Sequence, residues 1–218
     1  MTKISGYTAI TTVTADDEIV VVDVHDTTMA ASGTTKKMLL SQLSGLSNAE
    51  PLAGGGEAIF RRLDTNVTLG MASGTLALSY WTAVTSGAAT TATTATIGTA
   101  ASGLTYAAVG VYSVAGNGNL TLLGSSGDLH ASMWIGTYAS YPAAVAFTRV
   151  AGVRYAFGAL AVGSTPPYLA AAGANFAFND QAPIVFGNVP AQATLPNSIA
   201  NGSIGIYSAS GPAAYVTP

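Results

Sequence analysis

The chain consists of short runs of apolar and β-branched residues separated by glycine, serine and asparagine. Residues 75–83 (TLALSYWTA) alternate between apolar and polar positions, a pattern typical of a strand with one buried face. Residues 107–114 and 120–123 flank the segment 115–119 (AGNGN), whose Asn-Gly pair favours positive φ and so predicts a hairpin. Because no segment shows a helical period, we expect a mainly β fold built around a jelly-roll-like antiparallel β-sandwich.

The same pattern predicts further strands on both sides of this hairpin. They are expected at residues 19–24, 34–40, 58–63, 90–97, 144–148, 154–162, 184–186 and 203–207. A turn is expected around Ala151-Gly152. Residues 41–46 are typical of a helical turn, with Ser41 as N-cap and Gly45 as stop signal. The first two strands and this turn would form a small strand-loop-strand-helix module.

Charged residues divide the chain into two regions. They make up 8% of the sequence, against roughly 25% in an ordinary soluble domain. Thirteen of the 17 Asp, Glu, Lys and Arg residues fall within residues 1–64. We therefore expect an N-terminal module at 1–50, a Gly/Pro linker at 51–57 and a β-sandwich domain at 58–218. A module of about 50 residues buries too little apolar surface to be stable alone, so it should need copies of itself or a larger partner.

Composition also limits the functions that are open to the chain. The net charge is −3 and there is no basic stripe, so binding to nucleic acid is not expected. The absence of cysteine rules out disulfides and thiolate chemistry. No apolar run reaches the ~18 residues of a membrane span, and the first residues lack the pattern of a signal peptide. We expect a protein that is made in the cytoplasm and not inserted into a membrane.

A surface with so few charges is a poor solubiliser. It is either hydrated by Thr, Ser, Asn and Gly side chains or covered by partner chains. Composition leaves both interpretations open, and the second is a first indication of a component of an assembly.

Two groups of titratable residues are candidates for catalysis or metal binding. Around His25 lie Asp16, Asp17, Glu18, Asp23 and Asp26. Their spacing lacks the alternation and the central glycine of a calcium loop, so a solvated loop is favoured. Asp128 and His130 follow two serines, but no Gly-x-Ser-x-Gly elbow accompanies them, so a polar loop is again favoured over a catalytic triad. We expect no catalytic residue, no metal and no cofactor, and we interpret the chain as a protein that is not an enzyme.

Binding is the more plausible chemistry. Trp134, Tyr138 and Tyr141 lie in a stretch with loop character, and aromatic faces with polar edges are common recognition surfaces, for sugar rings among others. These three residues are the candidate ligand-binding site. The alternative is that Trp134 and its neighbours pack in the core or at a subunit interface. Tyr80 and Trp81, inside a predicted strand, are expected in the core.

The segment ADDEIVVVDVHDTTMAASGTTKKMLLSQL, residues 15–43, carries a resemblance to known proteins. It resembles a segment near the N-terminus of virion fibre and minor tail proteins of tailed phages, especially those of actinobacteria. The matching motifs are residues 26–30 (DTTMA) and 34–37 (TTKK), the latter preceded by a glycine. Residues 110–114, 151–158 and 195–203 are also similar to the terminal sandwich of such proteins. Unlike longer relatives, this chain has no coiled-coil or β-helical shaft, which leaves room for a head fibre or a capsid spike.

The resemblance implies a homotrimeric protein of the virion surface, with no enzymatic activity. Its N-terminal module would dock onto other virion proteins of the capsid or tail, and its sandwich would face outward, with a host-surface glycan as a further partner. The residues expected to serve docking and oligomerisation are Val20, Val22, Val24, Asp26, Thr27, Met29, Thr35, Lys36, Lys37, Leu39 and Leu43. Two alternatives remain: a capsid decoration protein with a purely structural role and, least favoured, a cell-wall hydrolase.

Overall fold

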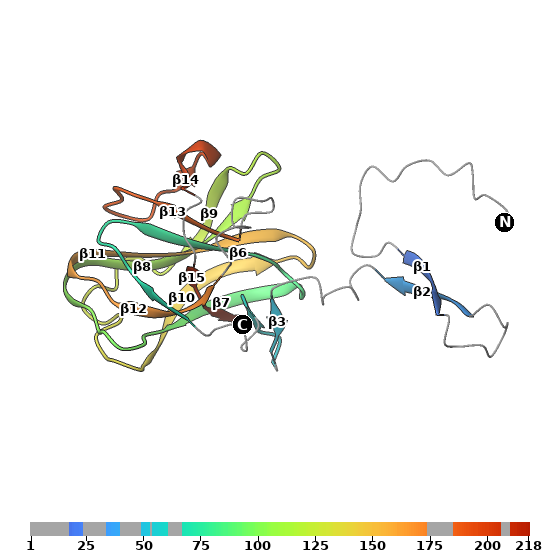
Figure 1. Ribbon diagram of the computed structural model, residues 1–218, viewed down its shortest axis with the longest axis horizontal. Helices are drawn as coiled ribbons and strands as arrows, with labels where there is room; N and C mark the ends of the chain where they lie inside the picture. The colour runs from blue at the N-terminus through green and yellow to red at the C-terminus, as the bar shows by residue number, and fades with distance from the viewer. Residues whose placement is uncertain are drawn as a thin grey trace. The chain divides into compact units, whose positions relative to one another are not determined.

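The computed structural model describes residues 18–23, 34–39, 49–52, 54–60, 67–173, 185–205 and 210–218 (Figure 1). The chain divides into two compact units, Met1–Leu46 and Ser47–Pro218. Within the first, strands β1 (Glu18–Asp23) and β2 (Thr34–Leu39) form an antiparallel hairpin whose register runs from Glu18↔Leu39 to Asp23↔Thr34. The two predicted strands are confirmed over these residues, and the helical turn expected at 41–46 lies outside the described residues.

The second unit is built from antiparallel strands. Its strands are β3 (Glu50–Pro51), β4 (Glu57–Ala58), β5 (Val67–Gly70), β6 (Leu76–Thr82), β7 (Gly87–Ala95), β8 (Ser102–Val114), β9 (Leu120–Ser125), β10 (Ser140–Arg149), β11 (Arg154–Thr165), β12 (Tyr168–Gly173), β13 (Phe186–Val189), β14 (Ser198–Ile199), β15 (Ser210–Pro212) and β16 (Tyr215–Thr217). A short 3-10 helix covers Asn201–Ser203. The expectation of a mainly β, antiparallel fold is therefore confirmed.

These strands form three sheets. One has the order β10-β7-β16-β4-β3, a second β13-β6-β11-β8-β9-β14 and a third β15-β12-β5. The pairs within them are nested around a central hairpin: β8 pairs with β9, β7 with β10, β6 with β11 and β5 with β12. An isolated bridge between Thr96 and Leu169 connects the end of β7 to β12. These strand pairs are therefore nested one outside the other around the β8–β9 hairpin.

The main core lies between the sheets and follows the period of two along each strand. On β8, Ala107, Val109 and Val111 face this core, and on β11 the odd-numbered residues from Tyr155 to Ala161 do so. From the facing five-stranded sheet, Ala92 and Val145 complete it. Side chains of alternate residues thus meet between two layers, which is the packing of a β-sandwich.

The six-stranded sheet is covered on its other face as well. Tyr112 of β8 and Leu160 of β11 pack there against Val189, Leu195 and Ile204 of the late segment. This second layer explains why β11 is buried along most of its length although its neighbours are antiparallel. Gly158 marks a close approach in this layer, since a Cβ on it would lie 2.9 Å from Leu76 Cδ1.

The hairpin predicted at residues 107–123 is confirmed. Strands β8 and β9 pair antiparallel up to Val114↔Leu120, and the turn is closed by the Ala115 N–H donating to the Asn119 carbonyl over 2.9 Å. Gly118 adopts φ +83°, a conformation that residues with a Cβ rarely take, which is why glycine occupies this turn.

Other elements differ from the prediction. Residues 51–57, expected as a linker, belong to the larger unit, where Pro51 pairs with Glu57 in the β3–β4 hairpin. Of the strand expected at 58–63, Ala58 lies in β4, residues 59 and 60 lie outside any strand, and residues 61–63 lie outside the described residues. Of the strand expected at 203–207, Gly205 forms an isolated bridge with Asn188, and residues 206 and 207 lie outside the described residues. The turn at 151–152 is present, but it joins β10 and β11, which lie in different sheets. Among the described residues, no helix has the length and apolar character needed to cross a membrane.

Candidate functional site

The connection between β9 and β10, residues 126–139, is the candidate functional site; we call it the 126–139 loop. It leaves the six-stranded sheet along β8, where the Ser126 and Leu129 N–H groups donate to the Val109 and Ala107 carbonyls. It then crosses to the five-stranded sheet, where β10 begins at Ser140. A loop of this length without regular structure is uncommon in a compact domain and is more often functional than an ordinary connection.

Trp134 anchors this loop in the core. Its side chain is fully buried, its indole Nε1–H donates to Thr94 Oγ1 over 2.9 Å, and its carbonyl accepts from the Ala101 N–H over 2.7 Å. The prediction that Trp134 binds ligand is therefore wrong, because no face of the ring is accessible for stacking. The alternative of core packing is the one observed, and Tyr80 and Trp81 are buried as expected.

The other two aromatic residues of the predicted site differ from each other. Tyr141 is partly buried, and its hydroxyl is engaged with the backbone of Gly136: it accepts from the N–H and donates to the carbonyl. Tyr138 is 77% exposed, and Ile135 close by is 60% exposed. The three candidates therefore do not form one recognition face. Tyr141 and Trp134 hold the loop, and Tyr138 is the aromatic side chain that it displays.

The backbone of this loop is strained. Trp134 adopts φ +63° and Tyr138 φ +52°, two of the three non-glycine residues with positive φ among those described. A left-handed conformation costs a bulky residue on the order of 1–3 kcal/mol and persists only where the surroundings impose it. Here Thr96 imposes it: its Oγ1 donates to the Gly136 carbonyl over 2.7 Å, and its N–H donates to the Ala139 carbonyl over 2.9 Å. Tyr138 is thus held between two fixed points.

Asp128 and His130 share a side-chain hydrogen bond on the same loop. His130 Nδ1 lies 2.8 Å from Asp128 Oδ2, with 45% and 37% of the two side chains exposed. Asp128 Oδ1 also accepts from the N–H groups of Ala107 and His130, each over 3.0 Å. Desolvation raises the pKa of Asp128, but the hydrogen bonds from Ala107 and His130 outweigh it and hold the pKa below its ordinary value.

This pair lacks the rest of a hydrolytic site within the described part of the chain. Ser126 Oγ accepts from the Val109 N–H and donates to the Gly127 carbonyl, so it is engaged with the backbone and not with His130. No set of three or more His, Asp or Glu side chains gathers to hold a metal ion among those residues. The carboxylate of Asp128 fastens the loop to β8, which is a structural role.

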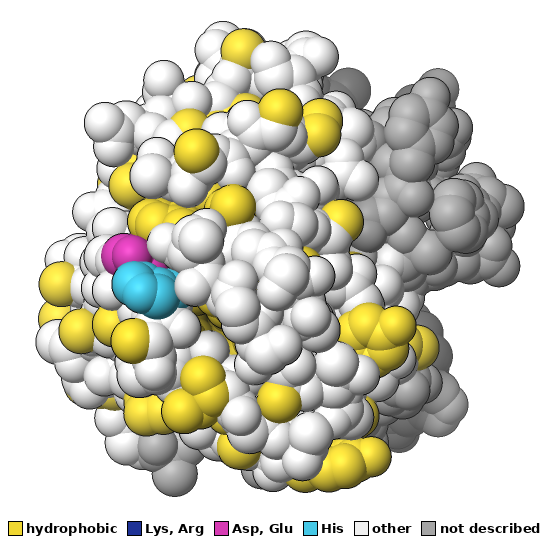
Figure 2. Space-filling view, turned by 90° about the vertical axis from the view of Figure 1, so that its left-hand side faces the viewer, with side chains coloured by type: hydrophobic (Ala, Val, Ile, Leu, Met, Phe, Trp, Pro, Cys, Tyr) yellow, Lys and Arg dark blue, Asp and Glu magenta, His cyan; other side chains and the backbone are white. Residues whose placement is uncertain are grey.

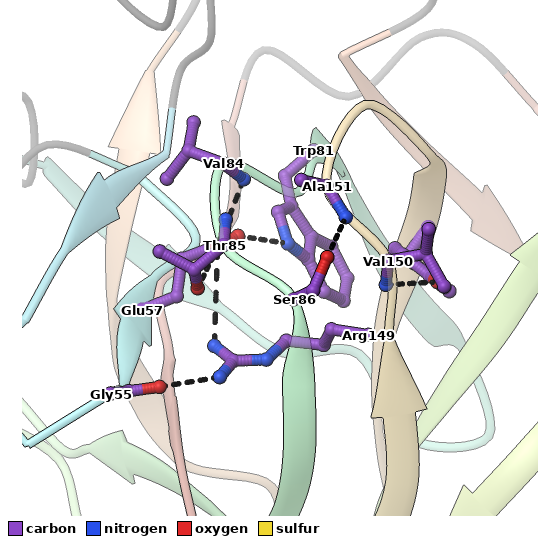
Figure 3. Close-up of polar contacts among 10 residues, drawn as sticks. Gly55, Glu57, Trp81, Val84, Thr85, Ser86, Arg149, Val150 and Ala151 are labelled. Atoms are coloured by element: carbon purple, nitrogen blue, oxygen red, sulfur yellow. Dashed lines mark hydrogen bonds and ion pairs between the residues drawn. The ribbon is translucent and has the colours of Figure 1, made fainter. Parts of the chain in front are cut away.

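A buried charged cluster was missed by sequence reasoning (Figure 3). Glu57 is fully buried and accepts from Trp81 Nε1 over 2.8 Å and from the backbone N–H groups of Val84 and Thr85, both over 3.0 Å. Arg149, also buried, points toward it with Nη1 3.9 Å from Glu57 Oε2, and Nη2 donates to the Gly55 carbonyl. The cluster joins β4, β6 and β10 across the sandwich and offers no open face to a ligand.

The described surface of the larger unit carries little charge. Figure 2 shows a face of apolar and uncharged polar side chains, where an acidic side chain lies beside a histidine. Glu57 and Arg149 are buried, and the guanidinium of Arg154 lies over the Tyr80 ring, 4.9 Å from its centroid. Among the described residues of this unit, solvent reaches the side chains of Asp128 and His130 and, in part, that of Arg154.

No model of a known protein family matches this chain, and no curated protein matches its sequence. The case for a function therefore rests on the residues themselves.

The predicted docking residues fall on and around the β1–β2 hairpin. Val20 and Val22 lie on β1, and the register pairs them with Lys37 and Thr35; Lys36 pairs with Val21, and Leu39 with Glu18. The others lie outside the described residues: Val24, Asp26, Thr27, Met29 and Leu43. The docking assignment stays a prediction.

Proposed function

We propose that this protein is a phage virion surface protein, a trimeric fibre or spike. Its N-terminal unit would anchor it to capsid or tail proteins, and its larger unit would be displayed outward for adhesion to the host surface. The observation that carries the proposal is the segment 15–43, which resembles the attachment segment of tailed-phage fibre proteins and belongs to a unit of its own. The proposed role involves no catalysis, no cofactor and no membrane insertion.

We further infer that the larger unit has jelly-roll topology. The nested pairs β5–β12, β6–β11, β7–β10 and β8–β9 are those of eight strands rolled up as one double strand. The order β6-β11-β8-β9 and the bridge from β7 to β12 support two sheets of four strands as the framework. The remaining short strands would then be additions to that framework.

Trimer formation is supported by size and charge. A two-stranded hairpin is marginal in water on its own, and three copies of the first unit could share a core that one copy lacks. The displayed face of β10 consists of Ser140, Pro142, Ala144, Ala146 and Thr148, small side chains without charge. Such a face packs against a neighbouring subunit without burying a charge, and closed cyclic symmetry is the usual outcome for identical chains.

The anchoring role is tested by deleting the codons for residues 1–46 from the gene in the phage genome. The cut is placed before Ser47 because Glu50 and Pro51 belong to the β-sheet of the larger unit. We expect the shortened chain to fold but to be absent from purified particles. Particles that still carry the shortened chain would contradict the anchoring assignment.

A purely structural decoration protein is the second candidate, favoured by the uncharged, small-residue face of β10. The two roles differ in adhesion. Purified full-length protein should bind host cells if it is an adhesin, and binding should saturate and be competed by unlabelled protein. Particles that carry the protein while the purified protein shows no saturable cell binding would favour decoration.

A further inference from the structure

We infer that the 126–139 loop is a recognition site for neutral saccharides, with the exposed Tyr138 ring as its stacking platform. The inference rests on the proposed adhesive role for the origin of the sugar. Its own basis is the geometry of the loop, which holds one aromatic side chain outward in a fixed, strained conformation.

The backbone around Tyr138 is held in place in the protein without ligand. Trp134 and Tyr141 hold the loop from within the unit, and Thr96 binds the backbone on both sides of Tyr138. A backbone fixed in this way loses little conformational freedom on binding, which is one reason why strain is tolerated at binding sites. The left-handed conformation of Trp134 serves core packing, whereas Tyr138 is in the left-handed region with its side chain exposed, which a simple connection would not need.

The exposed residues near Tyr138 in the sequence carry side chains that suit hydroxyl groups. Thr137 and Ser140 are exposed on either side of Tyr138 in the sequence, and Ile135 adds an apolar neighbour. A sugar presents an apolar C–H face to an aromatic ring and hydroxyls at its edge, which hydroxyl-bearing side chains bind. A ring with apolar and hydroxyl neighbours therefore matches a polyhydroxylated ligand.

Charge selects a neutral ligand over an anionic one. The described Lys and Arg side chains of this unit are Arg149, which is buried, and Arg154, which lies over Tyr80. The ionised group of the loop is the carboxylate of Asp128, which repels anions. Residues 126–139 include no lysine or arginine that could neutralise a sialylated, sulfated or phosphorylated glycan, so neutral hexose and N-acetylhexosamine chains are the fitting class.

The test uses the purified full-length chain on an array of neutral hexose and N-acetylhexosamine oligomers, with sialylated and sulfated oligomers beside them. We expect binding to neutral oligomers and none to the anionic series. Tyr138→Ala should weaken binding by about tenfold and Tyr138→Phe by less than about twofold, because the ring is the contact. Tyr215→Ala removes another exposed tyrosine, on β16, and is the matched control that should bind as wild type.

Thr96 gives a second test that does not touch the ligand. Thr96→Val removes the Oγ1 that holds Gly136 and Ala139 and should weaken binding several-fold, whereas Thr96→Ser keeps the hydroxyl and should restore it. The near-ultraviolet circular dichroism of the tyrosines should change in Thr96→Val and recover in Thr96→Ser. Equal binding by all three chains would overturn the positioning role.

Several outcomes would overturn the saccharide assignment itself. These are no binding to any neutral oligomer at millimolar concentration, preference for the anionic series, or wild-type binding by Tyr138→Ala. Binding to host cells that survives periodate but is lost after protease treatment would identify a protein partner instead. If particles carry the protein but no sugar binds, this inference alone fails; if sugars bind but particles lack the protein, the virion role alone fails.

Discussion

Replacing Glu57 by alanine should be among the most damaging single substitutions in the larger unit. The side chain is fully buried and receives the Trp81 Nε1–H, the Val84 and Thr85 N–H groups and the Thr85 hydroxyl. It is also the carboxylate nearest to Arg149, whose Nε and Nη1 have no hydrogen-bond partner among the described residues. The substitution therefore leaves a buried cation and several donors without an acceptor.

The magnitude follows from these contacts. Removing one partner of a buried ion pair costs about 3–5 kcal/mol, because the other charge stays buried without compensation. The orphaned Trp81 N–H would add about 1–3 kcal/mol if costs were additive, while the Val84 and Thr85 groups are partly exposed and can bind water. Since neighbouring effects overlap, we expect a total loss of about 3–5 kcal/mol, a large fraction of the ~5–15 kcal/mol typical of a domain.

Urea unfolding followed by tryptophan fluorescence measures this loss. The chain has two tryptophans, and Trp81 and Trp134 are both buried in the larger unit, so their emission reports its unfolding. Asp128→Asn, at a partly exposed acid, is the control and should cost less than about 1 kcal/mol. The double variant Glu57→Leu with Arg149→Met should regain much of the loss, since no charge is left buried. A cost below about 1 kcal/mol for Glu57→Ala would refute the reasoning.

Three further predictions concern single side chains. Tyr112→Phe should leave the free energy of unfolding unchanged or raise it, because the buried Tyr112 hydroxyl has no partner among the described residues. A fall in the free energy of unfolding of more than about 1 kcal/mol would contradict this. Gly118→Ala should cost about 1–2 kcal/mol, because φ is +83° and the new Cβ would lie 2.7 Å from Asn201, while Gly116→Ala, with open space, should be nearly neutral. The lowered pKa of Asp128 means that its carboxylate contributes stability above its ordinary pKa of 3.8, a contribution lost as the pH falls through the folded-state pKa. Unfolding of Asp128→Asn should therefore depend less on pH in that acid range than unfolding of wild type.

Strand positions could be predicted where local pattern decides them. The alternation of residues 75–83 identified β6 as a strand, although both of its faces are buried, with Trp81 in one apolar layer and Leu76 and Leu78 in the other. The turn at Gly118 needs a conformation that glycine readily adopts. The hairpin at 50–58 could not be predicted, because proline and glycine beside it are equally typical of a linker. What makes it part of the sheet is pairing with Tyr215, more than 150 positions away, which no local pattern encodes.

Local sequence pattern also fails to predict how the side chains of the candidate site are oriented. The sequence places Trp134, Tyr138 and Tyr141 close together, but it does not say which of them faces outward. The structure decides this through Thr94 and Thr96, whose hydroxyls hold Trp134 inside and the backbone around Tyr138 in place. Glu57 was missed for a related reason: its partners at 81–85 and Arg149 come from distant strands.

The distribution of charge has a consequence for recognition. The larger unit buries Glu57 and Arg149, places Arg154 over an aromatic ring and pairs Asp128 with His130, so its described part projects only a weak field. Long-range steering by these described residues therefore contributes little, and selectivity at the 126–139 loop must come from contacts at van der Waals and hydrogen-bond distance. Such contacts are barely screened by salt, so adhesion through the 126–139 loop should persist from low to high ionic strength, unlike attachment through clustered charges.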